Sequence, residues 1–395
     1  MNPRAEIRYD WIDNPASLDE FVDFASTREC YYLDTEFHRE KTYFPQLALV
    51  QIAVGDRIVL IDPLATDARA LRPLFDGPGT CVLHAAQQDL DVFSQVCGFV
   101  PARILDTQLC AGFLGYTQPS LASLAQSILK VTLPKGDRLS DWLRRPLTGD
   151  QKQYAAADVA FLEGITTAIV DQLSERGRLG WAEDACEELR TRPTGPNPPG
   201  DAWLRVKDVR TLRGRSRWVA KEVARWREER AIEQDLPPRH VLSDIAILGI
   251  AQKAPRTVDE MLQARGVDGR HVKGRHGADL LEAVRRGVDC SSEGDLPFPM
   301  SDSEDLDKSL RPAVTLVSAW VTELARQSDL DAGLLGTRRD IVDLLSNTPD
   351  ARLTHGWRAD IVGRDIEDLV GGRKALTFVT GDGGRALRLV EVPQT

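Results

Sequence analysis

YYLDTEFHRE, residues 31–40, places two acidic residues at the end of a strand-like run. Three apolar residues lead into Asp34, and Glu36 follows two positions later. Residues i and i+2 of a strand lie on the same face, so we expect the two carboxylates side by side, next to a buried stretch. Like charges held close repel each other, and burying each of them costs several kcal/mol. The stretch therefore requires a positive partner.

Length and composition indicate a soluble protein of several domains. The chain has 395 residues, of which 42% are hydrophobic and 28% charged, and a chain of this length usually folds as two or three domains. No apolar run approaches the roughly 20 residues that span a bilayer. The start has no apolar segment typical of a signal peptide, and the six cysteines are scattered without a CxxC pair. These features predict a cytoplasmic protein with reduced thiols and no membrane partner.

Charge is unevenly distributed along the chain. The net charge of −10 argues against a nucleic-acid partner, but residues 204–288 hold 19 Lys or Arg against 12 Asp or Glu. Residues 289–309 hold seven acids against one Lys. A basic segment therefore precedes an acidic linker, and the basic segment either contacts phosphates or is an ordinary solvated charged face.

Two stretches predict domain boundaries. RPTGPNPPGD (192–201) is rich in Pro and Gly, and the acidic linker 289–309 contains Pro, so neither continues a helix. Residues 1–191 alternate strands and helices, which predicts an α/β domain with a mixed sheet. Residues 202–288 and 310–395 are mainly helical, and the last segment ends in a predicted β-hairpin at 375–392. The expected strands of the first segment are 30–36, 46–54, 57–61, 80–85 and 103–105, and its helices are 15–27, 67–76, 87–97, 107–114, 120–129 and 150–173.

A third acidic residue lies at the start of the helix predicted at 87–97. With about 100° per residue, Asp89 falls at roughly 260° from Leu90, within the arc of apolar side chains, whereas Asp91 falls at roughly 100°, outside it. Asp89 is therefore expected to point inward and Asp91 toward water. The alternative is that Asp89 only favours the helix N-terminus through the helix dipole.

A fourth acidic residue belongs to QYAAADVAFLEGITTAIV. Tyr154 and Asp158 are four residues apart and hence neighbours on one helical face, which also carries Phe161, Leu162 and Ile165. Asp158 is therefore expected on the buried side of its helix. Taken alone, the pair favours a structural Tyr–Asp hydrogen bond over a functional site.

Together, the four inward acids Asp34, Glu36, Asp89 and Asp158 favour a metal site. Hard divalent cations bind carboxylate oxygens, and Mg²⁺ typically uses one or two of them per ion. Four carboxylates suit two ions, and two ions about 3.5–4 Å apart stabilise the attacking and leaving oxygens of a phosphodiester displacement. We therefore expect two divalent metal ions, Mg²⁺ or Mn²⁺, as the positive partner.

The same residues belong to motifs of a known family. LDTEF, HAAQQDLDVF and YAAADVAFL, in this order and spacing, resemble the three exonuclease motifs of the DEDD superfamily. The intervening YFPQLALVQIA, LIDPL, ILDTQL and DWLRRPLT resemble ribonuclease D specifically. The match covers nearly all of residues 1–190. Tyr154 matches the tyrosine subclass, because Gln153 stands where the other subclass has histidine.

This resemblance implies a fold, an activity and residue roles. It implies a ribonuclease H-like mixed sheet for residues 1–191 and hydrolysis of RNA from the 3′ end, with release of nucleoside 5′-monophosphates. It makes Asp34, Glu36, Asp89 and Asp158 metal ligands. Tyr154 would position the attacking water, because a phenol with a pKa of about 10 is a poor base at neutral pH.

The helical segments also resemble parts of this family. Residues 203–288, above all RWREERAIEQDLPPRHVLSDIAI, resemble the HRDC module, so residues 202–288 are expected to form an HRDC domain. Residues 310–395 resemble a degenerate second copy with a terminal β-hairpin, and HGWRADIV is similar to the ribonuclease D tail. The implied partners are RNA 3′ ends, with tRNA precursors among them, bound by a monomer.

Two other functions remain open at this point. The same metal chemistry would serve a 3′→5′ exonuclease that acts mainly on DNA, since no motif identifies a contact to the 2′-hydroxyl. A non-catalytic RNA-binding scaffold is the other alternative, although lost acidic ligands would be its expected mark.

Three single residues have predicted roles: Asp106 caps a helix, Asp62 belongs to a turn, and Tyr43 either stacks on a base or packs in the core.

Overall fold

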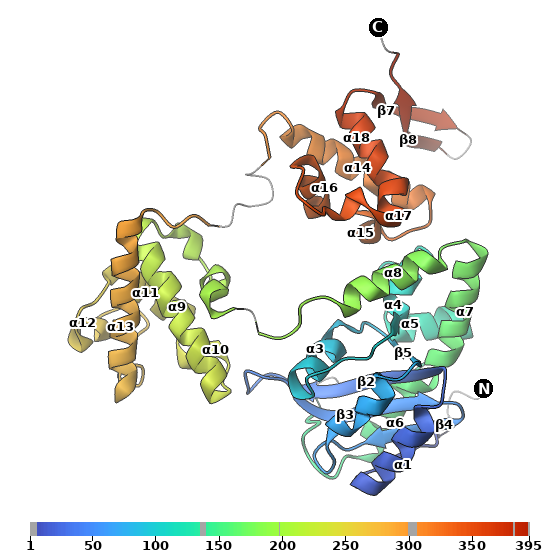
Figure 1. Ribbon diagram of the computed structural model, residues 1–395, viewed down its shortest axis with the longest axis horizontal. Coiled ribbons are helices and arrows are strands. Elements are labelled where there is room, and N and C mark those ends of the chain that lie inside the picture. The colour runs from blue at the N-terminus through green and yellow to red at the C-terminus, as the bar shows by residue number, and fades with distance from the viewer. Residues whose placement is uncertain (1–5, 135–139, 197, 299–305, 382–383, 394–395) are drawn as a thin grey trace.

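The structure is a computed structural model that describes residues 6–134, 140–196, 198–298, 306–381 and 384–393. Figure 1 shows three bodies: an α/β domain at the N-terminus, a helical domain beside it, and a C-terminal helical domain that carries a β-hairpin. No helix within the described part of the chain is long and apolar enough to cross a membrane.

The first domain is built on a six-stranded sheet with the order β1-β4-β3-β2-β5-β6. Strand β3 pairs in antiparallel orientation with β2 and β4, whereas β1 pairs in parallel with β4, and β5 pairs in parallel with β2 and β6. The predicted mixed sheet is therefore confirmed. Among the described residues, sequence analysis missed one strand, the three-residue β1, which pairs only with β4 at the edge of the sheet. The strands are β1 Asp10–Ile12, β2 Cys30–His38, β3 Gln46–Val54, β4 Arg57–Ile61, β5 Thr80–Leu83 and β6 Ile104–Asp106.

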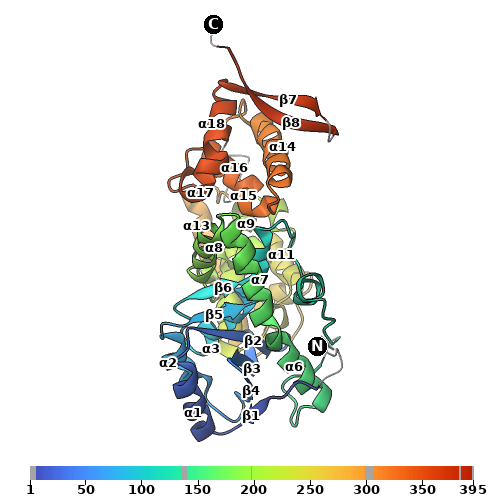
Figure 2. The same ribbon diagram turned by 90° about the vertical axis from the view of Figure 1, so that its right-hand side faces the viewer.

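Helices cover both faces of this sheet. One face packs against α1, α2 and α3, and α6 lies on the other face (Figure 2). The buried Ala155 and Ala156 let α6 lie close to Leu49 and Leu60 of the sheet. The helical elements are α1 Pro15–Ala25, η1 Ala68–Leu71, α2 Arg72–Phe75, α3 Gln87–Val96, α4 Thr107–Gly112, α5 Leu121–Leu124, η2 Ala125–Leu129, α6 Gly149–Ala160, α7 Leu162–Glu175 and α8 Leu179–Arg190.

The single helix predicted at 150–173 is wrong, because the chain forms two helices there. Phe161, at φ −108° and ψ −4°, ends α6 and precedes α7. The two helices have different neighbours, since α6 contacts β2, β3 and β4 while α7 contacts α4 and η2. Tertiary packing thus divides a segment whose hydrophobic periodicity looks continuous.

The second domain is helical and has its own hydrophobic core, formed by side chains such as Trp203, Val223 and Leu280. Its two longest helices approach closely at Gly287, where an added Cβ would lie 2.5 Å from the Cα of Val219. The elements are η3 Pro199–Arg205, η4 Val209–Thr211, α9 Gly214–Gln234, α10 Pro238–Val241, α11 Asp244–Lys253, α12 Val258–Leu262, α13 Arg275–Cys290 and η5 Ser291–Glu293.

The third domain shares a continuous core with the first domain. Trp357 stacks on Trp181 and meets the edge of Phe113, with ring centroids 5.3 Å apart in both pairs. The Arg358 guanidinium donates to the Glu188 carboxylate at 2.6 Å. The elements are α14 Arg311–Gln327, α15 Ala332–Leu335, α16 Arg338–Leu345, η6 Arg352–Thr354, α17 Gly356–Arg358, η7 Ala359–Gly363, α18 Arg364–Val370, β7 Lys374–Gly381 and β8 Gly384–Glu391.

The predicted C-terminal hairpin is confirmed, since β7 and β8 pair in antiparallel register from Lys374↔Glu391 to Gly381↔Gly384. The central residues of its predicted turn, 382–383, lie outside the described residues, as do residues 299–305 of the acidic linker. Of the two predicted boundaries, 192–201 separates two independent cores. The acidic linker leads into a domain that packs back on the first one.

Candidate metal centre

Strand β2 carries the first two acids. Asp34 lies opposite Gln51 and Glu36 opposite Leu49 in the antiparallel ladder with β3, and the register shifts between Glu36 and Phe37. The alternation of a strand puts Asp34 and Glu36 on the same face, which is the face covered by α6.

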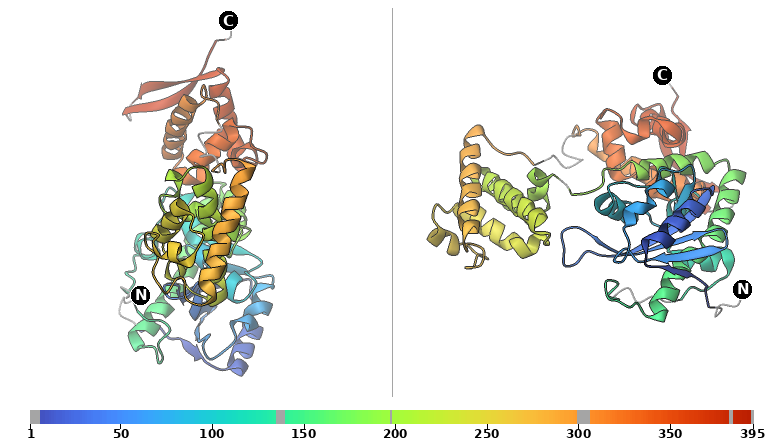
Figure 3. Two further views of the ribbon diagram at one scale, coloured as in Figure 1. Left: turned by 90° about the vertical axis from the view of Figure 1, so that its left-hand side faces the viewer. Right: turned by 60° about the horizontal axis from the view of Figure 1, so that its bottom comes forward.

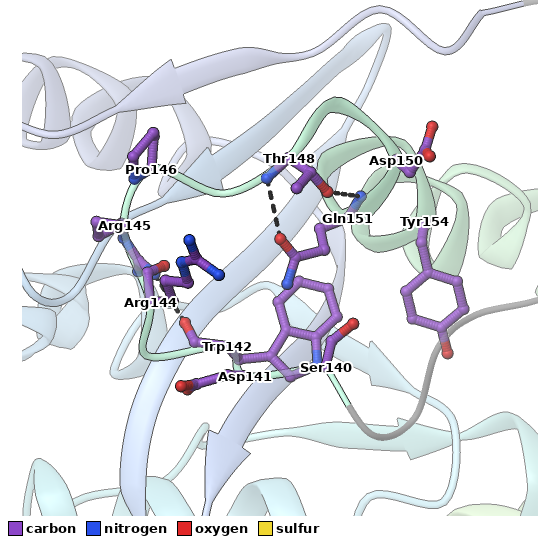
Figure 4. A pocket seen from close by; sticks show the side chains of 10 residues that line it. All are labelled: Ser140, Asp141, Trp142, Arg144, Arg145, Pro146, Thr148, Asp150, Gln151 and Tyr154. Carbon is purple, nitrogen blue, oxygen red and sulfur yellow. Dashed lines mark hydrogen bonds between the residues drawn. The ribbon is translucent and has the colours of Figure 1, made fainter.

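Helix α6 brings Asp158 onto this pair. Carboxylate oxygens of Asp34, Glu36 and Asp158 all lie within 4.8 Å of one another. The start of α6 is set by a reciprocal capping box (Figure 4). The Thr148 hydroxyl accepts a hydrogen bond from the backbone N–H of Gln151, and the side-chain oxygen of Gln151 accepts one from the backbone N–H of Thr148. A fixed first residue sets the angular position of every later side chain on the helix.

Asp89 reaches the site from a different direction. Strand β2 pairs with β5 only over Cys30–Tyr32, so the first turn of α3, which follows β5, lies beside the remaining edge of β2. Asp89 is 6% exposed and accepts a hydrogen bond from the Thr35 hydroxyl. The inward orientation predicted for Asp89 is confirmed. Its oxygens do not belong to the 4.8 Å group formed by the other three acids.

The four acids perturb one another strongly. Burial and the neighbouring carboxylates Asp34, Asp158 and Asp89 raise the pKa of Glu36 to about 9. Burial raises the pKa of Asp158 to about 7. Burial and the charge of Asp158 raise the pKa of Asp34 well above the usual range, and burial and the charge of Asp34 do the same to the pKa of Asp89. All four would be stabilised in their charged form by divalent cations, which accept carboxylate oxygens as ligands. The donor set therefore fits hard cations.

Tyr154 lies one helical turn before Asp158. Burial and the charges of Asp158 and Glu36 raise its pKa above the ordinary value for a phenol, so its hydroxyl stays protonated at neutral pH. The ring contacts Trp142 at a centroid distance of 6.2 Å. Both side chains line a cavity of about 670 Å³, and Figure 4 shows them among its lining residues.

The segment before α6 is held by an ion pair that sequence analysis missed. Arg145 donates to both carboxylate oxygens of Asp62 at 2.7 Å and to the Ala48 carbonyl at 2.6 Å. Asp62 also accepts from the Leu64 amide, so its predicted turn role is confirmed. The predicted cap is confirmed as well, because Asp106 accepts from the amides that open α4. The Arg145–Asp62 ion pair could not be predicted from a local sequence pattern, because the two residues are 83 positions apart.

The loop between β2 and β3 contacts the second domain. The amides of Tyr43 and Phe44 donate to the Asp235 carboxylate at 3.0 and 2.9 Å, and the Tyr43 hydroxyl donates to Glu228 at 2.6 Å. Figure 3 shows this loop extending from the sheet toward α9 and α10. Tyr43 therefore has a third role, an interdomain contact, which neither sequence alternative anticipated. A loop residue and a helix end about 190 residues apart leave no local pattern.

Comparison with known proteins gives consistent matches. The 3′-5′ exonuclease family profile matches residues 9–174 and the HRDC domain profile matches residues 216–284. Ribonuclease D of Acidiphilium cryptum is 33% identical over 97% of both chains. Ribonuclease D of Escherichia coli is 32% identical over 92% of this chain and 99% of its own. The crystal structure of Escherichia coli RNase D, an exoribonuclease involved in structured RNA processing, has a TM-score of 0.82 and 31% identity over the same shares of the two chains.

Proposed function

Because this chain belongs to the ribonuclease D family of 3′→5′ exoribonucleases, we propose that its acidic centre hydrolyses RNA from the 3′ end with two divalent cations. Asp34, Glu36, Asp89 and Asp158 would hold the cations. The observation that carries this proposal is the group of three carboxylates within 4.8 Å. Burial raises the pKa of all three, and neighbouring carboxylates raise it further for Asp34 and Glu36, so a bound cation would favour their charged forms.

The proposed roles of the four acids and of Tyr154 follow from the positions of their side chains. Asp34, Glu36 and Asp158 would bind from β2 and α6, and Asp89 would bind from α3, held by Thr35. Two bound divalent ions stabilise the attacking and leaving oxygens of a phosphodiester displacement. Tyr154 would orient the attacking water through its protonated hydroxyl, because a phenol with a raised pKa does not act as a base at neutral pH.

The finer substrate assignment is also a proposal. We infer that the products are nucleoside 5′-monophosphates and that the substrates include the 3′ ends of tRNA precursors, bound by a monomer. The 19 basic residues of segment 204–288 support a phosphate-binding role for the HRDC domain, because such contacts hold RNA without reading its sequence. We assign residues 1–191 to catalysis, residues 202–288 to RNA binding and residues 310–395 to a divergent HRDC-like domain that packs on the first.

One experiment tests the reaction. Purified protein is incubated with RNA and DNA labelled at either end, in Mg²⁺, Mn²⁺ or EDTA. We expect stepwise shortening of RNA from the 3′ end only when metal is present, with labelled 5′-monophosphate released from the 3′-labelled strand. Faster cleavage of DNA would instead identify the alternative DNA exonuclease. Cleavage that persists in EDTA would contradict the metal site.

A further inference from the structure

The C-terminal hairpin is anchored to its domain at one end. Leu376 and Leu389, opposite each other in the register, pack against the shared core. The Lys374 ammonium binds Asp365 at 2.7 Å and Asp368 at 3.2 Å. These contacts fix the direction of the ribbon, which lies at the end of the molecule farthest from the catalytic sheet (Figures 1 and 2).

The other half of the ribbon projects with an aromatic side chain and a cation on one face. Phe378 is 73% exposed, the largest fraction among the described large apolar side chains. Phe378 pairs with Leu387, and Arg385 pairs with Thr380, so Phe378 and Arg385 are diagonal neighbours on the same face. Arg388 pairs with Thr377 and lies on the opposite face. Neither arginine bonds to another described side chain.

We propose that the face formed by Phe378 and Arg385 binds a single-stranded segment of the RNA substrate, with a base on the ring and a phosphate on the guanidinium. The inference rests on RNA being the substrate. Exposed aromatic rings accept any base by stacking, and an adjacent cation matches the backbone charge. An arginine that has no partner among the described residues favours an anionic ligand over an apolar protein surface. The distance from the acids predicts an effect on long RNA and none on a short oligonucleotide.

The test compares two arginines that differ in face. Affinity for a tRNA-sized RNA with a single-stranded tail is measured in EDTA across a salt series for Phe378→Ala, Arg385→Ala and the control Arg388→Ala. We expect roughly tenfold weaker binding for Phe378→Ala. Arg385→Ala should flatten the slope of log affinity against log salt by about 0.7, whereas Arg388→Ala should leave it unchanged. Cleavage of a trinucleotide in Mg²⁺ should be the same in all three variants.

Three results would overturn this inference. Equal affinity in all variants would remove the hairpin from RNA binding. Equal losses of affinity in Arg385→Ala and Arg388→Ala would show that binding does not depend on the face formed by Phe378 and Arg385. If light scattering shows a dimer that Phe378→Ala converts to a monomer, with no change in affinity, the exposed face binds a second copy of the chain. If the wild-type protein cleaves DNA but does not cleave RNA, the proposed function itself is refuted.

An independent observation concerns Gln51 in the centre of β3. Gln51 is fully buried and lies opposite Asp34 on one side and Leu60 on the other. Neither its amide nitrogen nor its amide oxygen has a hydrogen-bond partner among the described residues. A buried amide without a partner is costly, and natural cores seldom retain one without a reason.

The geometry points to Gln51 as a positioning residue of the proposed metal centre. Directly opposed residues of an antiparallel pair have Cβ atoms about 5 Å apart, which brings the amide within reach of the Asp34 carboxylate. The Gln51 N–H would donate to the Asp34 oxygen that does not face a cation, and would so fix the orientation of the ligand. This inference depends on the metal-binding role proposed for Asp34.

Binding of Mn²⁺ measured by calorimetry tests this role apart from catalysis. Gln51→Met keeps the volume of the side chain and removes the amide. We expect about 10- to 100-fold weaker Mn²⁺ binding, with an unchanged or higher melting temperature of the metal-free protein. Leu49→Met, at the position opposite Glu36, is the control and should leave Mn²⁺ binding unchanged. Equal affinity in Gln51→Met and wild type would refute the inference, whereas a wild type that binds no Mn²⁺ would refute the metal centre itself.

Discussion

The contact between the β2–β3 loop and α9 predicts that Asp235 couples the catalytic and HRDC domains. The Asp235 carboxylate accepts two backbone N–H groups of the loop, at 3.0 and 2.9 Å. A hydrogen bond to a charged group is worth about 1.5–3 kcal/mol. Because Asp235 is partly exposed, we take the lower end, about 1.5 kcal/mol, for each bond, so loss of both bonds should weaken docking by up to about 3 kcal/mol.

The choice of replacement separates this effect from backbone strain. Asp235 has φ 50° and ψ 47°, a left-handed conformation that alanine adopts at a cost of about 1–2 kcal/mol. Asp235→Gly removes the acceptor without that strain. Asp235→Asn keeps a side-chain oxygen and tolerates the left-handed region, so it is the matched control.

Hydrogen exchange of the Tyr43 and Phe44 amides measures the docking directly. In Asp235→Gly we expect exchange at least about 30-fold faster than in wild type, which corresponds to about 2 kcal/mol. Asp235→Asn should remain within a few-fold of wild type. Affinity for structured RNA should fall in Asp235→Gly, while cleavage of a trinucleotide should not change. Equal protection of both amides in the Gly, Asn and wild-type proteins would show that the Asp235 carboxylate does not hold the loop on α9.

Four further predictions concern the acidic centre. Asp34→Asn should abolish most cleavage and leave the protein folded, and wild-type turnover at saturating Mg²⁺ would exclude Asp34 as a ligand. Asp89→Asn should lose activity while Asp91→Asn, about 200° away on α3, retains it; equal losses with folding preserved would contradict the assignment. Tyr154→Phe should lower single-turnover cleavage by roughly 10²–10⁴-fold with Mn²⁺ affinity unchanged by calorimetry. An acid whose pKa is raised in the folded state loses stabilisation as pH rises, so the metal-free melting temperature should fall between about pH 5 and 9 as Glu36 ionises. Mg²⁺ should raise the melting temperature more at pH 8 than at pH 5.5, and equal rises at the two pH values would contradict this.

Features with a local period were predictable from the sequence. The alternation of β2, the apolar arc around Asp89 and the four-residue spacing of Tyr154 and Asp158 each describe one element, and each predicted orientation follows from the geometry of that element alone. The C-terminal hairpin followed from its turn residues for the same reason. The resemblance to family motifs added the prediction that these residues act together.

Contacts between distant elements were decided only by the tertiary structure. The division of the helix at Phe161, the placement of Asp89 on Thr35 and the Arg145–Asp62 ion pair all depend on which elements pack together. The core shared by the first and third domains and the docking of Tyr43 on α9 do so as well. Hydrophobic periodicity predicts which face of an element is buried, but it does not identify the element that packs against that face. The partner depends on the packing of the whole chain, where burial of apolar area outweighs local propensity.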